Sequence, residues 1–481
     1  MGNVLPLLAG LMLFPVIISA YGLERFGLLT LAWSLVGYFG LFDLGLSRAL
    51  TQQVSMLLAQ GQDETDIAEL VRTSFRLMWI LGLVGGAALW LAVPFIVTNL
   101  LHVSVLLRTE TVLAFSVLSI SIPIVVHTSA LRGILESLHL FKEASLIRMV
   151  MGVGTFLGPF LASFFSTSLV GAIYTLIVVR IIVWILHIVC VNRSDILNPI
   201  TTSFHRRWIK PLFQFGSWMT LSNIIGPLMV YLDRFVIASM LGVASVAYYV
   251  APYEVVSKLW VIPVAISGVL FPLFAQHFKT QPDKVMDMLD KGVRYVLLLL
   301  FPVSIMMAAF SHQWLGLWLG SNFSLESSGV VTWLVAGVIV NSAAQILFAK
   351  VQGAGRSDLT AKLHLLELLP YLLLLWILLK EFGVVGAAMA WCARVVMDFF
   401  GLVYIARQLH LKRDSRLLQL MIFTLVCTLL ILLIGCINDN KTKLIILLTL
   451  TPLYIWLAIT QMHADGMIAS IRNYLKIRHN D

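Results

Sequence analysis

The sequence predicts an all-α polytopic membrane protein with about 14 transmembrane helices, and three observations lead to this class. Of the 481 residues, 59% are hydrophobic and 12% are charged, whereas soluble domains are about 25% charged. Apolar runs recur along the chain, each near the length of about 20 residues that a helix needs to cross a bilayer. These runs are continuous rather than alternating, which favours helices over a membrane barrel.

Fourteen spans are expected when the apolar runs are measured against the bilayer. The second run, 26–58, is longer than the bilayer is thick, so its amphipathic end is expected to continue into water. The spans are 4–20, 26–58, 74–101, 111–134, 144–166, 168–191, 213–241, 246–275, 291–311, 327–350, 360–380, 383–406, 417–437 and 443–461.

The distribution of lysine and arginine predicts the orientation. With both termini in the cytoplasm, the cytoplasmic loops and span ends hold 24 of these residues and the outer loops hold five. Cytoplasmic loops of membrane proteins carry the excess of positive charge, so we expect both termini to be cytoplasmic. The outer connections are short, such as 242–245. No extracellular domain of a size suited to catalysis is therefore expected.

A weak internal repeat indicates two halves. Residues 16–22 read "VIISAYG" and residues 236–242 read "VIASMLG", with four of seven positions identical. The repeat falls at the first and the seventh span, so two six-helix halves would have the same orientation, as in transporters with parallel repeats. We therefore expect an N-terminal lobe at 1–191, a cytoplasmic linker at 192–212, a C-terminal lobe at 213–410, and two further spans with a cytoplasmic tail at 411–481.

Charged residues within the spans are the candidates for a functional site. A charge at the bilayer centre costs at least about 2.5–3.5 kcal/mol, so each of these side chains must pair with another or line a wet cavity. The candidates are Asp43, Arg180, Asp233, Arg234, Glu254, Lys258, Glu367, Arg394 and Asp398.

Spacing separates these charges into pairs and single residues. Glu254 and Lys258 are four residues apart, as are Arg394 and Asp398, so each pair lies on one helix face. They form either structural salt bridges or part of a cavity wall. The adjacent residues 233 and 234 point about 100° apart and must find partners on other helices or in water. An interhelical bridge and a position in a central hydrated cavity both fit them.

The remaining candidates leave similar alternatives. Arg180 has no acid near it on its own span, so it needs a carboxylate from another helix or an anionic ligand. Asp43 either carries a coupling proton or caps a helix break. Glu367 lies near His364, which permits a proton relay, whereas His187 is interpreted as a packing residue.

Several nucleotide and metal motifs are absent from the sequence. There is no P-loop, no GxGxxG that opens a helix after a strand, and no HExxH. We therefore expect no cofactor, no metal, no nucleic-acid partner and no enzyme activity. A transporter of this kind would be driven by an ion gradient or by the gradient of its own substrate.

Two stretches resemble a known family. "YGLERFGLLTLAWSLVGYFGLFDLGLSRALTQQVS" at 21–55 resembles the N-terminal signature of bacterial polysaccharide and O-antigen flippases. Residues 231–259 resemble the seventh and eighth helices of that family, and "FPLFAQ" at 271–276 fits the end of the eighth. The likeness covers about residues 10–410. The matching positions are Gly22, Glu24, Phe26, Gly27, Asp43, Leu44, Gly45, Leu46, Asp233, Arg234, Leu241, Gly242, Tyr249 and Ala251.

This resemblance implies membership of the multidrug, oligosaccharidyl-lipid and polysaccharide exporter superfamily. It implies two six-helix lobes in a V around a central cavity. The implied substrate is a lipid-linked oligosaccharide on undecaprenyl pyrophosphate, moved from the cytoplasmic to the periplasmic leaflet of the bacterial inner membrane. Other proteins of the glycan assembly pathway are possible partners. The cationic residues that would bind the pyrophosphate and sugars are Arg180, Arg234, Lys258 and Arg394.

Two other functions compete with this interpretation. The four cations and five acids within the spans sum to −1, and a net acidic cavity is typical of a drug or organic-cation antiporter of the same superfamily. A glycan polymerase or ligase is the second alternative, although such enzymes carry a larger outer loop. On the flippase interpretation, Arg234 attracts the pyrophosphate or an acidic sugar, and Asp233 holds Arg234 or takes part in ion coupling.

Overall fold

A computed structural model describes residues 4–39, 43, 45–61, 63–194, 205–210, 212, 229, 231–409 and 415–464. The predicted span 213–241 lies outside these residues except for 229 and 231–241, as do most of the predicted linker and the C-terminal tail. All regular secondary structure in the described residues is helical, with no strand among them.

The first half of the described chain is a series of helices joined by short turns. Residues 231–241 are also helical. The helices are α1 (Val4–Phe39), α2 (Leu46–Ala59), α3 (Glu64–Phe95), η2 (Ile96–Leu100), α4 (Val105–Ser119), α5 (Ile122–Ser137), α6 (Phe141–Ser163), α7 (Leu169–Asn192), η3 (Arg206–Trp208) and α9 (Val243–Val256).

The second half continues in the same way and includes the longest helix. Its elements are η4 (Ser257–Trp260), α10 (Val261–His277), α11 (Pro282–Ala309), α12 (Ser311–Leu319), α13 (Ser321–Gly353), α14 (Ser357–Gln408), α15 (Ser415–Cys436) and α16 (Asn440–Ala464).

Among the described residues, 11 helical segments are long and apolar enough to cross a membrane. Two of these segments each consist of two helices, because α1 contains a break at Gly22 (φ 75°) and α14 contains one at Gly383 (φ 57°). Only glycine adopts such positive φ values readily, so the chain turns at these residues and each half can be a separate span. Together with the largely undescribed span 213–241, this agrees with about 14 helices and confirms the predicted fold class.

The predicted second span is not one continuous helix. α1 ends at Phe39, and a separate amphipathic helix, α2, begins at Leu46. Gly45 precedes α2 with a φ of 73°, which is left-handed and interrupts the helical hydrogen-bond ladder. The predicted span 26–58 is therefore divided at this point, where the sequence left a helix break capped by Asp43 as one alternative, and its amphipathic end forms α2.

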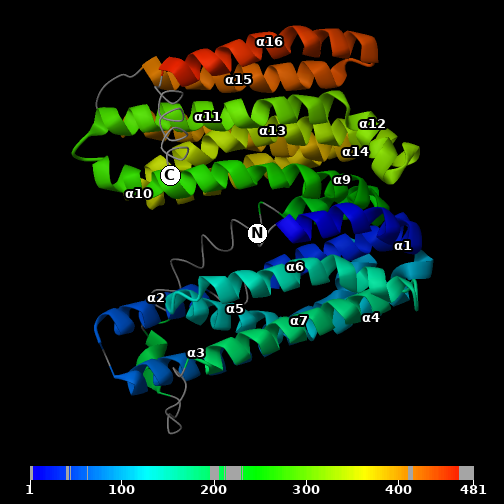
Figure 1. Cartoon of the computed structure of the whole chain (residues 1–481). Coiled ribbons are helices and arrows are strands. Elements are labelled where there is room, and N and C mark those ends of the chain that lie inside the picture. The colour runs from blue at the N-terminus through cyan, green and yellow to red at the C-terminus, as the bar shows by residue number, and fades with distance from the viewer. Residues whose placement is uncertain are drawn as a thin grey trace, which may run out of the picture. The chain divides into compact units, whose positions relative to one another are not determined.

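The described chain divides into two compact units. The first consists of Met1–Lys258, Leu315–Val330 and Ala361–Arg394, and the second of Leu259–Trp314, Val331–Thr360 and Val395–Asp481. In the first unit α6 packs along both α1 and α7, and α5 also contacts α7 (Figure 1). These four helices surround the candidate site described below.

Close packing of α1 against α9 depends on a glycine. A Cβ atom at Gly27 would lie only 1.9 Å from the carbonyl oxygen of Val243, far inside van der Waals contact. The helix backbones can approach this closely only because position 27 lacks a side chain, as small residues permit at membrane helix interfaces.

The start of α7 is held by a clamp of polar contacts. Arg25 donates to both oxygens of Glu110 at 3.0–3.2 Å. Glu110 also accepts from the backbone N–H of Leu169 at 2.5 Å and from the hydroxyl of Ser168 at 3.0 Å. A carboxylate at a helix N-terminus satisfies a free N–H group and complements the helix dipole. The clamp thereby fixes α7 against α1 and α4.

In the second unit, α11 packs against α15, and α16 follows α15 as its neighbour (Figure 1). Tyr454 of α16 donates its hydroxyl to the carbonyl oxygen of Leu298, and its ring contacts Phe301 at a centroid distance of 5.8 Å. Lys443 donates to the carbonyl oxygen of Ala309 at 2.7 Å. Both contacts join α16 to α11.

Candidate functional site

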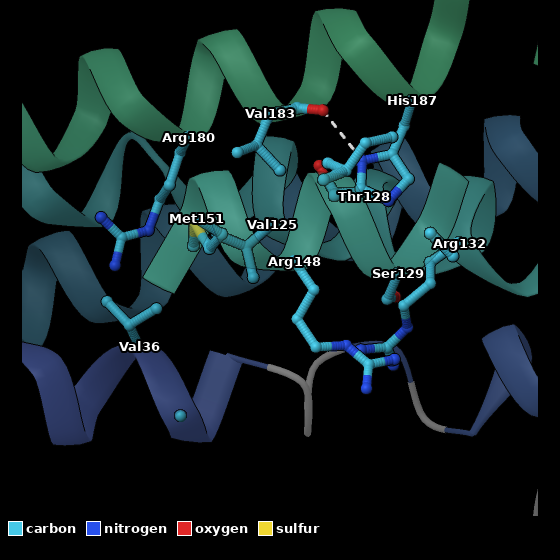
Figure 2. A pocket seen from close by; sticks show the side chains of 13 residues that line it. Val36, Val125, Thr128, Ser129, Arg132, Arg148, Met151, Arg180, Val183 and His187 are labelled. Carbon is cyan, nitrogen blue, oxygen red and sulfur yellow. Dashed lines mark hydrogen bonds between the residues drawn. The ribbon is translucent and has the colours of Figure 1, made fainter. Parts of the chain in front are cut away.

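A cavity of about 280 Å³ lies among α1, α5, α6 and α7 in the first unit (Figure 2). Its wall carries three arginines, a histidine and two hydroxyl residues, with small and aliphatic side chains between them. None of the described residues that line it is acidic. The polar lining residues are Thr128, Ser129, Arg132, Arg148, Arg180 and His187. This composition suits an anionic ligand, and we refer to the space as the arginine cavity.

Arg180 is the buried cation of the arginine cavity. Its residue surface is only 4% exposed. Nη1 donates to the carbonyl oxygen of Leu176 at 2.9 Å, and Nε has no hydrogen-bond partner in the described structure. No described carboxylate forms an ion pair with Arg180. The sequence left two partners open for Arg180, a carboxylate from another helix or an anionic ligand. No such carboxylate is found among the described residues, which favours the anionic ligand.

His187 lies on the same side of α7 as Arg180. The two are seven residues apart, about two helical turns, and both line the cavity (Figure 2). The Nδ1 atom of His187 is 2.8 Å from the carbonyl oxygen of Val183, whereas its buried Nε2 has no partner in the described structure. His187 was interpreted from the sequence as a packing residue; it is buried, and it also lines the site.

Arg132 and Arg148 stand at the exposed end of the arginine cavity. Their side chains are 52% and 56% exposed. Both approach Glu136, at 3.7 Å from Arg132 and 3.9 Å from Arg148. Exposed pairs at such distances contribute about 0–1 kcal/mol, so Glu136 holds these arginines only weakly. Both arginines lie near the ends of predicted spans, so they were not among the candidate site residues.

Asp43 caps a helix break next to this cavity. Its Oδ1 accepts from the backbone N–H of Gly45 at 2.7 Å, and its Oδ2 accepts from the hydroxyl of Ser47 at 2.5 Å. The hydroxyl of Ser129, a lining residue, lies 3.3 Å from the same Oδ2. The geometry is that of the capping alternative, and a coupling role for Asp43 remains a prediction.

Asp233 and Arg234 lie in a buried polar network, and neither residue lines the arginine cavity. Asp233 is 0% exposed, and it accepts from the Tyr249 hydroxyl at 2.6 Å and from the backbone N–H of Arg234 at 2.7 Å. The guanidinium of Arg234 donates to the Ser34 hydroxyl at 2.8 Å and lies 5.1 Å from the ring centre of Tyr253. These contacts join α1, the helix at 231–241 and α9.

The other predicted site residues are dispersed. Lys258 and Glu254 form the expected pair at 3.2 Å, with both side chains partly exposed. Arg394 lies over the Tyr371 ring at 5.6 Å. Glu367 and Asp398 are both buried on α14. Of the four cations predicted to bind substrate, the structure therefore places only Arg180 in the arginine cavity.

A bundle of membrane-crossing helices with a cationic cavity inside it defines an integral multi-pass membrane protein of the transport class. Comparison with known proteins supports this class. Residues 22–328 match the family described as "Polysaccharide biosynthesis protein". The chain is also 33% identical over 402 residues to a putative O-antigen transporter of Shigella flexneri, a match that covers 82% of this chain and 93% of that protein. The chain therefore belongs to the polysaccharide biosynthesis protein family.

Solved structures share the fold at low sequence identity. The lipid II flippase MurJ, in an inward closed conformation, aligns with a TM-score of 0.72 at 13% identity, over 96% of this chain and 98% of that one. An inward-facing multidrug resistance transporter of the MATE family and MOP superfamily aligns with a TM-score of 0.72 at 15% identity, over 87% and 95%. This confirms the expected superfamily fold.

Proposed function

We propose that this protein is a flippase that carries a lipid-linked oligosaccharide from the cytoplasmic to the periplasmic leaflet of the bacterial inner membrane by alternating access. The observation that carries the proposal is the buried Arg180, which faces a cavity and has no acidic partner in the described structure. The family supports it, as does the relative named as an O-antigen transporter. The substrate would be the undecaprenyl-pyrophosphate-linked repeat unit of an O-antigen or similar polysaccharide.

The diphosphate of such a lipid matches the arginine cavity chemically. A guanidinium presents a planar fork of donors that binds phosphate oxygens in pairs, and it stays charged at any relevant pH. Burial lowers the local dielectric and strengthens the attraction to an anion. At the exposed end, Glu136 would compete with the diphosphate for Arg132 and Arg148, which would allow an anion to enter and to leave.

The proposed orientation places the exposed end of the cavity at the cytoplasm. With both termini cytoplasmic, as the positive-inside rule predicts, α5 ends and α6 begins on that side. Arg132 and Arg148 would then meet a substrate arriving from the cytoplasmic leaflet. Arg180 would lie about 10 Å further in than His187, from the helical rise of 1.5 Å per residue.

Two six-helix lobes remain our proposal for the domain organisation, with boundaries at 1–191, 192–212, 213–410 and 411–481. The backbone conformation at the end of each repeat copy supports this organisation. Gly22 and Gly242, which end the two copies of the repeated heptapeptide, both have positive φ values, of 75° and 91°. Each glycine stands at the turn between two helices, as equivalent positions in a duplicated fold would.

The remaining predicted charges are proposed to serve transport through conformational change and coupling. Arg234, Lys258 and Arg394 would contact the glycan part of the substrate when the lobes open. Asp43, Asp233, Glu254, Glu367 and Asp398 are the candidates for ion coupling. Asp233 and Arg234 are buried here, so this role requires a state in which their network opens.

The experiment that tests the function is a sidedness assay for a fluorescent lipid-linked oligosaccharide in liposomes that contain the purified protein. It is run with and without a proton gradient. We expect Arg180→Gln to slow translocation by about tenfold to hundredfold, the worth of hydrogen bonds to a charged group. Arg180→Lys should retain part of the rate, because it keeps the charge and loses the fork.

Arg356→Gln is the matched control, since Arg356 is an exposed arginine paired with Asp358 at 2.9 Å and lies outside the cavity. It should translocate at the wild-type rate. Full activity of folded Arg180→Gln protein would contradict the role of the arginine cavity. Movement of an organic cation without any movement of the glycan lipid would identify an antiporter of the same superfamily instead.

A further inference from the structure

The imidazole of His187 has one ring nitrogen engaged and one without a partner. Its residue surface is 4% exposed, and it lines the arginine cavity from the same helix as Arg180 (Figure 2). Nδ1 lies 2.8 Å from the Val183 carbonyl oxygen, and the buried Nε2 forms no hydrogen bond in the described structure.

The bond to Val183 fixes which nitrogen carries hydrogen in the neutral ring. A carbonyl oxygen can only accept, so Nδ1 must be the donor and Nε2 is left with a lone pair. A buried polar atom without a partner is uncommon and costs about 1–3 kcal/mol. An atom of this kind in a cavity wall is expected to find its partner on a ligand.

The groups around His187 decide what that ligand is. Among the described residues, α5 contributes Arg132 and Glu136, and α6 contributes Arg148. α7 itself contributes Arg180, and α1 contributes only the uncharged Val36 and Gly37. The Glu110 carboxylate from α4 lies at the far end of α7, on the backbone of Leu169. Asp43, at the break before α2, accepts from the hydroxyl of the lining residue Ser129 at 3.3 Å and adds a second carboxylate beside the cavity. Three arginines against the carboxylates of Glu136 and Asp43 leave a cationic balance around His187.

An anion in this cavity conflicts with a bare Nε2 lone pair, since two acceptors repel each other. A proton on Nε2 removes the conflict, because the ring then donates to an anionic oxygen. Without an anion, the same proton would place a fourth positive charge beside the three arginines. Anion and proton therefore favour each other's binding.

We propose that His187 takes up one proton at Nε2 when a diphosphate anion enters the arginine cavity, so that the site binds the anion and a proton together. The proton comes from water or buffer and forms one N–H bond, and no other bond changes. This inference rests on the proposed function for the identity of the anion, while the proton linkage is a separate property of the site.

The linkage predicts a direction for the pH dependence. Over the range in which the empty site holds neutral His187 and the occupied site holds the protonated form, affinity for the anion rises as the pH falls. The change is at most about tenfold per pH unit for one proton. Histidine is the side chain suited to such a change between about pH 5 and 8.

The test is isothermal titration calorimetry of the full chain in phosphatidylcholine nanodiscs with UDP-glucose, a soluble diphosphate diester whose phosphates do not titrate near neutral pH. Uridine, which lacks the diphosphate, is the ligand control. Titrations in buffers of different ionisation enthalpy give the number of protons taken up. We expect uptake approaching one proton per bound anion, and weaker binding as the pH is raised.

His187→Gln should bind UDP-glucose without proton uptake and with little pH dependence. His277→Gln is the matched control, because His277 makes the same type of bond, from Nδ1 to the Leu273 carbonyl oxygen at 3.0 Å, on α10 outside the cavity. It should behave as the wild type. If phosphatidylglycerol in the nanodiscs competes with UDP-glucose and proton uptake persists, the same proton-linked site also accepts a phospholipid headgroup.

Two results would overturn the inference, and they are distinguishable. Binding of UDP-glucose by the wild type without proton uptake would refute the role of His187 and leave the proposed flippase function intact. No binding at all would refute the anion site itself, and the translocation assay with Arg180→Gln would then show whether the flippase proposal fails with it.

Discussion

At the scale of single residues, two arginines that are buried in the described structure have opposite surroundings. Arg234 is surrounded by Asp233, a serine hydroxyl and tyrosine rings. Arg180 has one backbone carbonyl and an open cavity. A buried charge whose partners are present is expected to have a structural role, whereas a buried charge without an acidic partner is expected to bind a ligand. This contrast is why we place the anion at Arg180.

The network around Asp233 gives a stability prediction. Tyr249→Phe removes the hydroxyl that donates to Oδ2 of Asp233 at 2.6 Å and leaves a buried carboxylate oxygen without that donor. We expect a loss of about 1–3 kcal/mol, measured as a lower melting temperature of the protein in detergent. Tyr248→Phe is the control, because the ring of Tyr248 packs on Phe323 and, within the described structure, its hydroxyl donates no hydrogen bond to a buried carboxylate. Equal melting temperatures for the two variants would show that the Tyr249 hydroxyl is not structural.

Some of these residue contacts could be predicted from the sequence and others could not. The Glu254–Lys258 pair follows from spacing on one helix, and the structure has it at 3.2 Å. The bond from Arg234 to Ser34 joins residues 200 positions apart, and no local pattern reveals it. Arg132 and Arg148 were missed for the same reason, since only the packing of α5, α6 and α7 brings them into one cavity with Arg180.

At the scale of helices, glycines decide where elements end and how closely they approach. Composition and length located the spans well, because burial in lipid requires long apolar helices. A break near Asp43 was one of two alternatives that the sequence left open, and the left-handed conformation of Gly45 before α2 agrees with it. Where a helix ends in lipid depends on the backbone conformation of one residue, and the hydropathy of the sequence does not predict that conformation.

The contact between α1 and α9 predicts a sharp difference between two glycine substitutions. Gly27→Ala would place Cβ against the Val243 carbonyl oxygen, so the two helices must separate, at a cost typical of overpacking of about 1–3 kcal/mol or more. Gly268→Ala on α10 meets nothing within 4 Å and should be neutral or slightly stabilising. Thermal unfolding of both variants measures the difference, and a Gly27→Ala protein as stable as Gly268→Ala would rule out the close approach.

At the scale of the whole molecule, the sequence predicted a multi-pass transport protein, and family membership agrees with it. The fold shared with MurJ and the MATE transporter does not by itself choose between an anionic lipid and a cationic drug. The cationic lining of the arginine cavity favours the anionic lipid. The in-span charges sum to −1 over the chain, yet Arg180 is the one of these nine that lines the arginine cavity, and its charged neighbours in the lining are both arginines. A total over all spans was therefore a poor guide to one site.

A ligand that binds only the folded protein should stabilise the whole molecule. UDP-glucose at about 100 times its dissociation constant would add about 2.7 kcal/mol to the stability of the wild type. We therefore expect it to raise the melting temperature of the wild type in nanodiscs and to raise that of Arg180→Gln much less. Arg356→Gln should respond as the wild type does. An equal rise in wild type and Arg180→Gln would place the anion elsewhere.

The sequence around Arg180 also governs whether the chain can be made. During synthesis each helix passes from the translocon into lipid before its neighbours are all in place, and an arginine at its centre opposes that step by about 2.5–3.5 kcal/mol. In "LIVVRIIVWIL" at 176–186 the flanking residues are almost all leucine, isoleucine and valine, each favouring entry by about 0.3–0.6 kcal/mol. α7 therefore carries its own charge into the bilayer. Insertion of α7 therefore needs no acidic partner on a neighbouring helix, and in the folded protein the Arg180 guanidinium remains available to bind a ligand.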